Sequence, residues 1–117
     1  MKNKYDINWM DNVDSTNDEV RRHISDLDNL SVLSVLSQSA GRGQRGNSWH
    51  SEAGRNLLFS VLLKDPGIQA YDQFVISQMA SLSLVDLLAS HNIQAEIKWP
   101  NDIYVGEKKI CVMLVEN

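Results

Sequence analysis

Two short apolar runs on either side of a glycine- and arginine-rich segment constrain the fold of this chain most strongly. The runs are Leu30–Gln38 and Asn56–Leu63, and four glycines and three arginines lie between Gly41 and Asn56. Continuous apolar runs of this length are typical of buried strands, and the second run is expected to be covered on both faces. The sequence therefore predicts two strands joined by a long, mobile, cationic loop. Such loops are usually functional or disordered, so a solvated connection without function stays the alternative.

The other expected elements surround these two strands. Apolar residues at three- and four-residue spacing predict an amphipathic helix over Gln69–His91, with Asn92 as its stop. A capping box of Thr16 and Glu19 predicts a helix that runs to about Ile24. Further strands are expected at Asp6–Val13, Ala95–Lys98, Ile103–Val105 and Lys108–Val115. The order β-α-β-β-α-β-β-β implies an α+β domain, in which helices pack on a mixed β-sheet.

Charge separates the glycine-rich segment from the rest of the chain. With 117 residues and a net charge of −4, the chain supports one domain and lacks the basic surface typical of general nucleic-acid binding. Between Ser39 and Lys64, however, Glu52 is the only acidic residue, against four basic residues: Arg42, Arg45, Arg55 and Lys64. A local cationic stretch in an acidic protein is the pattern expected where an anion is bound.

Compartment and metal signals are weak. Cys111 is the only cysteine, so an internal disulfide is excluded, and no apolar signal-peptide region follows the N-terminal lysines. The stretch Gln69–Asn92 is interrupted by polar residues and does not read as membrane-spanning. We therefore expect a cytoplasmic protein that does not associate with a membrane. The three histidines lie far apart, which makes a zinc site improbable.

The glycines also satisfy a dinucleotide-binding pattern, G-x-G-x-x-G, at Gly41, Gly43 and Gly46. That turn needs a helix directly after the glycines, and Asn47–Asn56 shows no helical period. A P-loop would end in Gly-Lys-Ser/Thr, which is absent. What remains is a loop whose glycines allow backbone N–H groups to approach an anion and whose arginines offer forked donors.

Several short motifs occur together with this loop. They are Ser15-Thr16-Asn17, Gln38–Gly43 (QSAGRG), Trp49 and Lys98–Asp102 (KWPND). With them, nearly the whole chain resembles the catalytic domain of biotin protein ligases. The resemblance implies a fold like that of class II aminoacyl-tRNA synthetases. It also implies an enzyme that joins biotin to ATP, forms biotinyl-5′-AMP and passes biotin to a lysine of a biotin carboxyl carrier protein, an acetyl-CoA carboxylase subunit. Ligases of lipoate or octanoate are the nearest alternative.

The resemblance assigns roles to individual residues. Lys98 and Arg42 are the expected catalytic cations, Lys98 contacting both the biotin carboxylate and the α-phosphate. Fixed cations lower the barrier to attack of one anion on another. The expected substrate-binding residues are Ser15, Thr16, Asn17, Gln38, Gly41, Gly43, Arg45 and Trp49. Arg42, Asn101 and Asp102 are expected to place the nucleotide, with Asn101 or Asp102 near a Mg²⁺ ion.

Structural roles stay open for several of these residues. Thr16 could only cap its helix, Gln38 could only end a strand, and Trp49 could only anchor the loop. Asp102 could cap a turn, and Lys98 could make a surface contact at a strand end.

The chain also departs from the family pattern. Gln44 stands where some relatives carry a second arginine, which implies looser retention of the adenylate. Cys111-Val112 replace a small residue and a glycine, so bulk is added where backbone approaches ligand. The resemblance also implies further strands and a C-terminal barrel, which the residues up to Asn117 are not expected to contain, and we expect no DNA-binding segment before Tyr5. We therefore expect residues 1–117 to be a partial catalytic domain with weak or absent activity alone.

A non-catalytic module is the second class of function that the sequence allows. It would be a remnant that binds biotin or nucleotide and forms homo-oligomers through an exposed edge at Lys108–Val115.

Overall fold

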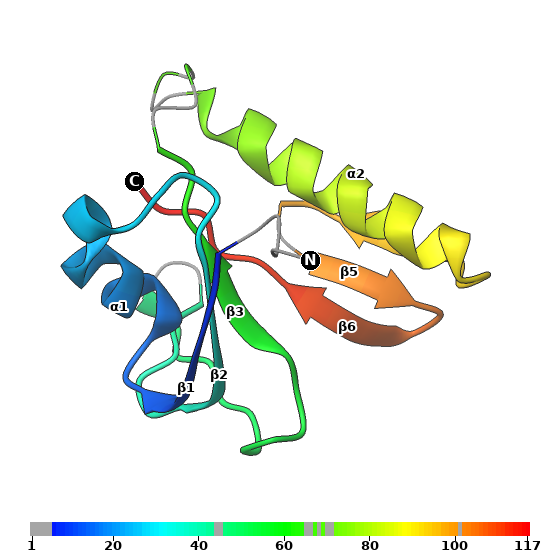
Figure 1. Ribbon diagram of the computed structural model, residues 1–117. Helices are drawn as coiled ribbons and strands as arrows, with labels where there is room; N and C mark the ends of the chain where they lie inside the picture. Colours follow the sequence, from blue (N-terminus) through cyan, green and yellow to red (C-terminus); the bar gives the residue numbers. More distant parts are fainter. Residues whose placement is uncertain (1–5, 44–45, 65–66, 68, 70–71, 101) are drawn as a thin grey trace, which may run out of the picture. The chain divides into compact units, whose positions relative to one another are not determined.

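The computed structural model describes residues 6–43, 46–64, 67, 69, 72–100 and 102–117. The chain forms two compact units, Met1–Pro66 and Gly67–Asn117, and each is described by itself. The first unit contains β1 (Ile7–Val13), α1 (Thr16–Arg22), the short 3₁₀ helix η1 (Ile24–Asp26), β2 (Val32–Gln38) and β3 (Leu58–Val61). The second contains α2 (Phe74–Ser90), β4 (Glu96–Lys98), β5 (Asp102–Val105) and β6 (Lys108–Val112) (Figure 1). The predicted α+β class and the order of the elements are confirmed.

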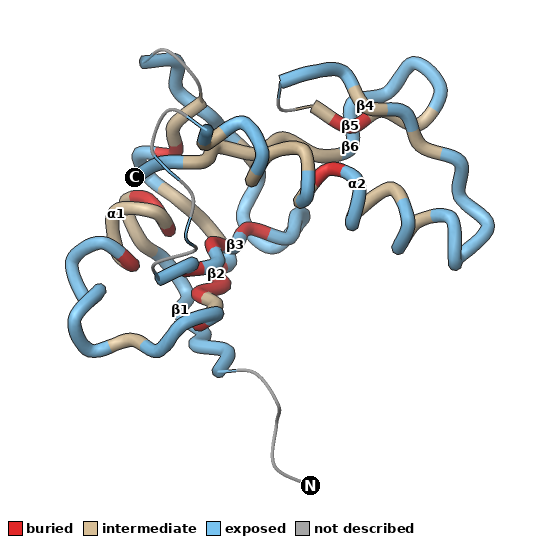
Figure 2. The backbone as a smooth tube through the Cα atoms, turned by 90° about the horizontal axis from the view of Figure 1, so that it is seen from above, coloured by how far each residue is buried: buried red, intermediate tan, exposed pale blue. Residues whose placement is uncertain are grey.

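The first unit contains a mixed three-stranded sheet in the order β1-β2-β3. β1 runs parallel to β2, with Ile7 opposite Val32, and β3 runs antiparallel to β2, with Val61 opposite the same Val32. A parallel pair needs a crossover connection, and α1 with η1 provides it. Among the described residues of this unit, the buried apolar core consists of Val20, Leu33, Val35, Leu58 and Leu62. The buried segments of β2 and β3 are visible in Figure 2.

The cap of α1 lies one residue earlier than the capping box predicted. Ser15 has an extended backbone, and its Oγ accepts a hydrogen bond of 3.3 Å from the Asp18 backbone N–H. Thr16 is already helical, so its hydroxyl is not at the cap position. The helix ends at Arg22, before the predicted Ile24, and the His23 N–H donates to the Val20 carbonyl there. Serine is among the preferred N-cap residues because its hydroxyl oxygen can accept a hydrogen bond from a backbone N–H of the first helical turn. The Thr16 hydroxyl is consequently available for another contact.

Burial alternates along β3, which contradicts the prediction of a strand covered on both faces. Leu58 and Ser60 are buried, whereas Phe59 and Val61 are 46% and 47% exposed. Successive side chains of a strand point to opposite faces, so only one face of β3 meets the core of this unit. Ser60, on the buried face of this apolar run, therefore points its hydroxyl toward α1.

The second unit contains an antiparallel sheet in the order β4-β5-β6. Ile103 of β5 is fully buried, and Phe74 of α2 makes an edge-to-face contact with Trp99, with ring centroids 5.5 Å apart. A turn with Gly106 at a positive φ of 61° joins β5 to β6. The strands expected at Ile103–Val105 and Lys108–Val115 thus pair as an antiparallel hairpin. β6 ends at Val112, short of the predicted Val115, and the Val115 carbonyl instead accepts a hydrogen bond from Gln73 Nε2.

The helix predicted over Gln69–His91 is α2, which is shorter at its start. Asn92 adopts a left-handed φ of 62° just beyond it, as the predicted stop requires. The apolar stripe is not buried along its length, because Met79 and Leu82 are 57% and 54% exposed, and Ser81 is the buried residue of the described helix. In the part of the chain that the structure describes, no helix has the length and apolarity that crossing a membrane requires.

Candidate functional site

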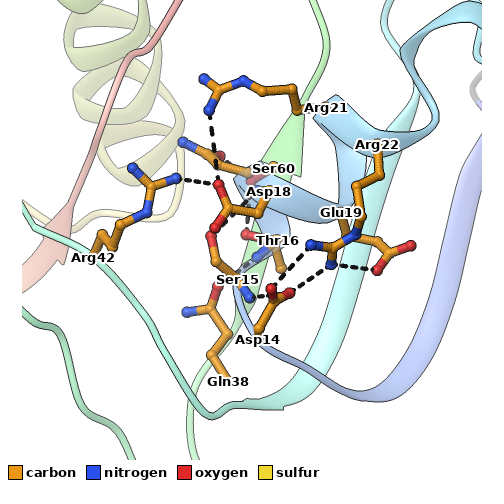
Figure 3. Close-up of polar contacts among 11 residues, drawn as sticks. Asp14, Ser15, Thr16, Asp18, Glu19, Arg21, Arg22, Gln38, Arg42 and Ser60 are labelled. Atoms are coloured by element: carbon orange, nitrogen blue, oxygen red, sulfur yellow. Dashed lines mark hydrogen bonds and ion pairs between the residues drawn. The ribbon is translucent and has the colours of Figure 1, made fainter.

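Side chains from three elements meet at the N-terminus of α1 (Figure 3). The Thr16 backbone N–H donates to Gln38 Oε1 at 2.8 Å, which ties the helix to the end of β2. Ser60 of β3 places its Oγ 2.7 Å from Thr16 Oγ1 and within hydrogen-bond distance of Asn17 Oδ1. Four residues of this group were predicted to bind substrate, namely Ser15, Thr16, Asn17 and Gln38. We call these four residues together with Ser60 the α1 N-terminal cluster.

The glycine-rich loop contains a short antiparallel pairing next to this cluster. Trp49 N–H donates to the Gly41 carbonyl at 2.7 Å, Gly43 N–H donates to the Asn47 carbonyl at 2.6 Å, and Arg42 faces Ser48 in an isolated bridge. The described part of the loop is therefore held by backbone hydrogen bonds.

Gly41 sits in the closest part of this pairing. A Cβ at Gly41 would lie 2.6 Å from the Trp49 carbonyl oxygen and 3.1 Å from Gln38 Nε2. Only a residue without a side chain fits between the loop and the cluster, which gives the glycine a packing reason.

Arg42 reaches from the loop to α1. Its Nη2 lies 2.5 Å from Asp18 Oδ1, and Arg21 Nη1 approaches the same oxygen at 3.7 Å. Both Arg42 and Asp18 are about one-third exposed. The guanidinium is thus held beside the α1 N-terminal cluster, as a cation that contacts an anionic ligand there would have to be.

Lys98 and Asp102 form a second group, in the second unit. They are directly opposite each other in the β4–β5 pair. The Lys98 ammonium lies 4.0 Å from the centroid of the Tyr104 ring, a cation–π contact, and Lys98 is exposed. Asp102 Oδ2 contacts Lys109 Nζ at 3.3 Å. Lys98 is therefore an exposed cation whose direction an aromatic ring helps to set.

The remaining predicted residues vary in what the structure says of them. Trp49 is 37% exposed, and its contact with biotin stays a prediction. Arg45 and Asn101 lie outside the described residues. Cys111 is half-buried at the end of β6, where burial first and the Asp102 charge second raise the pKa of its thiol.

Sequence reasoning missed Ser60 and Asp18. Ser60 lies inside a run that was interpreted as continuously apolar, and it could have been found by testing Leu57–Leu63 for alternation, because it is the polar residue of that stretch. Asp18 had no signal, because it meets Arg42 only when the loop folds back on α1.

A carboxyl and guanidinium network stabilises the start of α1. Arg22 donates from Nη2 to Asp14 Oδ1 at 2.6 Å and from Nη1 to Asp14 Oδ2 at 3.0 Å, and it also contacts Glu19. This forked contact, with a smaller contribution from the Ser15 N–H, lowers the pKa of Asp14 from its ordinary 3.8 to about 2. Hydrogen bonds to Asp14 first and Glu19 second raise the pKa of Arg22, and Arg22 in turn lowers the pKa of Glu19.

Replacing Asp14 by asparagine is therefore expected to destabilise the chain in a pH-dependent way. Because the folded pKa of about 2 is below the ordinary 3.8, the stabilisation is complete above about pH 4 and is lost as the pH falls toward 2. Thermal unfolding of the wild type and Asp14→Asn between pH 7 and pH 2 measures this. The two midpoints should converge at low pH, whereas Asp28→Asn, an exposed carboxyl outside the network, should show no such convergence. A constant gap between wild type and Asp14→Asn would contradict the linkage.

Residues 9–117 match the model of the Biotin/lipoate A/B protein ligase family, and the chain belongs to that family. The resemblance predicted from the motifs is thus confirmed.

Two curated relatives are ligases by name, and the name of one of them specifies biotin. The chain is 30% identical over 106 residues to "Bifunctional ligase/repressor BirA" of Escherichia coli, covering 89% of this chain and 32% of that protein. It is 34% identical over 107 residues to "Biotin--[acetyl-CoA-carboxylase] ligase" of Paracoccus denitrificans, covering 89% and 44%. The chain thus spans less than half the length of these curated relatives.

Solved structures give the same result. The biotin protein ligase from Aquifex aeolicus in complex with biotin and ATP has a TM-score of 0.70 and 32% identity, over 89% of this chain and 43% of that one. The biotin acetyl coenzyme A carboxylase synthetase from Helicobacter pylori, with bound biotinylated ATP, has a TM-score of 0.69 and 26% identity, over 91% and 52%.

Proposed function

We propose that this chain takes part in the ATP-dependent activation of biotin to biotinyl-5′-AMP and in the transfer of biotin to a lysine of a biotin carboxyl carrier protein. One observation carries the proposal. The motif residues Ser15, Thr16, Gln38, Gly41 and Arg42, far apart in sequence, meet around the start of α1 through the contacts described above. Relatives of this chain bear the name of biotin ligases and include complexes with biotin and ATP.

The proposed chemistry has two steps. In the first, a biotin carboxylate oxygen attacks the α-phosphorus of ATP, a new P–O bond forms, and pyrophosphate leaves with the broken bond's electrons. In the second, the neutral amine of a carrier lysine attacks the acyl carbon, AMP leaves, and the amine loses a proton. Both steps gather negative charge on oxygen, which fixed cations stabilise.

Arg42 and Lys98 are the proposed cations for these steps. Arg42 supplies a forked donor beside the α1 N-terminal cluster, and its contact with Asp18 must loosen when a phosphate or carboxylate takes it. Lys98 supplies a compact ammonium at the end of β4, supported by Tyr104. Asp102 and Asn101 are proposed to contact the nucleotide.

Mg²⁺ is a finer part of the proposal, and the described residues do not build a site for it. Among them, no group of three or more His, Cys, Asp or Glu side chains could hold a metal ion. Asp102, the carboxylate predicted to help, contacts Lys109. Mg²⁺ in ATP-using enzymes commonly takes most of its ligands from phosphates and water, so we assign no step to a protein-held metal.

Titration calorimetry with biotin and with lipoate tests the ligand class. The family description covers both ligases, so lipoate is the second candidate. We expect biotin to bind at least about tenfold more tightly than lipoate, because the α1 N-terminal cluster offers polar partners that a dithiolane cannot use. Tighter binding of lipoate would replace the first candidate by the second, and binding of neither would overturn the proposal.

Location and assembly stay predictions. From the sequence we propose a cytoplasmic location, the acetyl-CoA carboxylase carrier as partner, and self-association through the edge of β6. Sedimentation at high protein concentration measures the last of these.

A further inference from the structure

Ser60 is a buried polar residue to which the motifs assign no role. It lies on the inward face of β3 and is 8% exposed. Its hydroxyl oxygen sits between two residues of the α1 N-terminal cluster, 2.7 Å from Thr16 Oγ1 and within hydrogen-bond distance of Asn17 Oδ1. A buried hydroxyl with two polar neighbours fixes how their protons are arranged.

Counting protons gives this network one direction. A serine hydroxyl has one proton, and a side-chain amide oxygen can only accept. The Ser60 proton must therefore serve the bond to Asn17 Oδ1 if both contacts are hydrogen bonds. The 2.7 Å contact then requires the Thr16 hydroxyl to donate its own proton to Ser60 Oγ. Thr16 is left with acceptor lone pairs alone for any further partner.

The neighbouring Gln38 amide has the opposite polarity. Its Oε1 accepts from the Thr16 backbone N–H at 2.8 Å, so its Nε2 is on the other side, the side facing Gly41. Gln38 thus presents N–H donors next to an acceptor on Thr16. An acceptor beside a donor is complementary to a head group in which an N–H adjoins a C=O.

We propose that Ser60 is a positioning residue that sets the hydrogen-bond polarity of Thr16 and thereby selects an acid with a cyclic urea over one with a dithiolane. This inference rests on the proposed function and deepens it. A urea offers both N–H and C=O groups, whereas the lipoate ring offers neither. Lipoate would leave the buried Thr16 acceptor and the partly buried Gln38 donor unpaired, and such unpaired groups are the basis of strong discrimination.

The test compares Ser60→Ala with Ser34→Ala. Ser34 is also buried, on the adjacent strand β2, and its Oγ has no hydrogen-bond partner within the described residues. Both variants delete one buried hydroxyl. Only Ser60→Ala breaks the hydrogen bonds that link Thr16 through Ser60 to Asn17, which we call the relay. Calorimetry with biotin and with lipoate is expected to show about a tenfold loss of biotin affinity for Ser60→Ala, with lipoate affinity changed less than about threefold. Ser34→Ala should keep both affinities.

Three outcomes would overturn the relay. Ser60→Ala could bind biotin as tightly as Ser34→Ala does, or it could lose biotin and lipoate equally, which indicates a structural role alone. If Ser60→Ala does not fold, Ser60→Cys replaces it, since a thiol of similar size is a weak donor. Ser60→Cys should show an intermediate loss of affinity for biotin only. An unchanged biotin affinity of Ser60→Cys is the third outcome that would overturn the relay. A wild-type chain that binds no biotin would instead overturn the proposed function, and the relay with it.

Discussion

Replacing Lys98 by alanine is expected to lower the rate of biotinyl-adenylate formation at least about 100-fold, the scale seen when one fixed charge or donor at a developing anion is removed. The proposed first step joins two anions, and Lys98 is an exposed ammonium at the end of β4 with Tyr104 beneath it. Biotin binding should persist, because the residues proposed to hold its head group lie in the first unit. Biotin-dependent exchange of labelled pyrophosphate into ATP measures the rate, and calorimetry measures the binding.

Lys108→Ala is the matched control for this prediction. Lys108 is also an exposed lysine of the second unit, at the start of β6, and no role is assigned to it. Its removal changes the net charge by the same amount, so it accounts for any general electrostatic effect. Adenylation that survives in Lys98→Ala, or that falls equally in Lys108→Ala, would remove Lys98 from the proposed chemistry.

Replacing Gly41 by alanine should have the second large effect, on the loop and on biotin affinity. The new Cβ would lie 2.6 Å from the Trp49 carbonyl oxygen, which is a backbone atom. Real Cβ atoms essentially never lie so close to another heavy atom. Either the loop pairing between Gly41 and Trp49 opens or Gln38 moves. We expect a loss of about 1–3 kcal/mol in the free energy of unfolding, the usual cost of overpacking. Biotin affinity should fall about tenfold or more.

Gly43→Ala is the control for the loop. Its Cβ would lie 3.5 Å from Asn47 Cβ, an ordinary contact, so its stability should match the wild type within about 1 kcal/mol. Urea unfolding gives the stability, and the indole N–H signal of Trp49 in a two-dimensional NMR spectrum reports the loop. A wild-type-like Trp49 signal and stability in Gly41→Ala would show that the close approach is not needed.

The elements of the fold were largely predictable, because they depend on local signals. Apolar runs, turn residues and helical spacing predicted the order of helices and strands, and the left-handed Asn92 and the turn at Gly106 follow from residue type. The wrong predictions concern features that depend on tertiary contacts, namely the helix cap and the burial of a strand face. The cap moved from Thr16 to Ser15 because the backbone turns helical at Thr16, and the far face of β3 is exposed because one face alone meets the core.

The candidate site divides in the same way. Motif resemblance located Ser15, Thr16, Gln38, Gly41, Arg42 and Lys98, since their identities and spacing are visible in one dimension. It did not find Ser60 or Asp18. Their contacts, with Thr16 and with Arg42, join residues 44 and 24 positions apart. No local pattern contains such a pair.

By itself, the sequence determined the family, the order of the elements and the residue types available for binding an acid and a nucleotide. The tertiary structure alone decided which hydroxyl caps α1, which strand face is buried, and which carboxylate holds Arg42. The physical reason is that hydrogen-bond direction and burial depend on neighbours brought in by folding, whereas propensity and motif depend on residues adjacent in the chain.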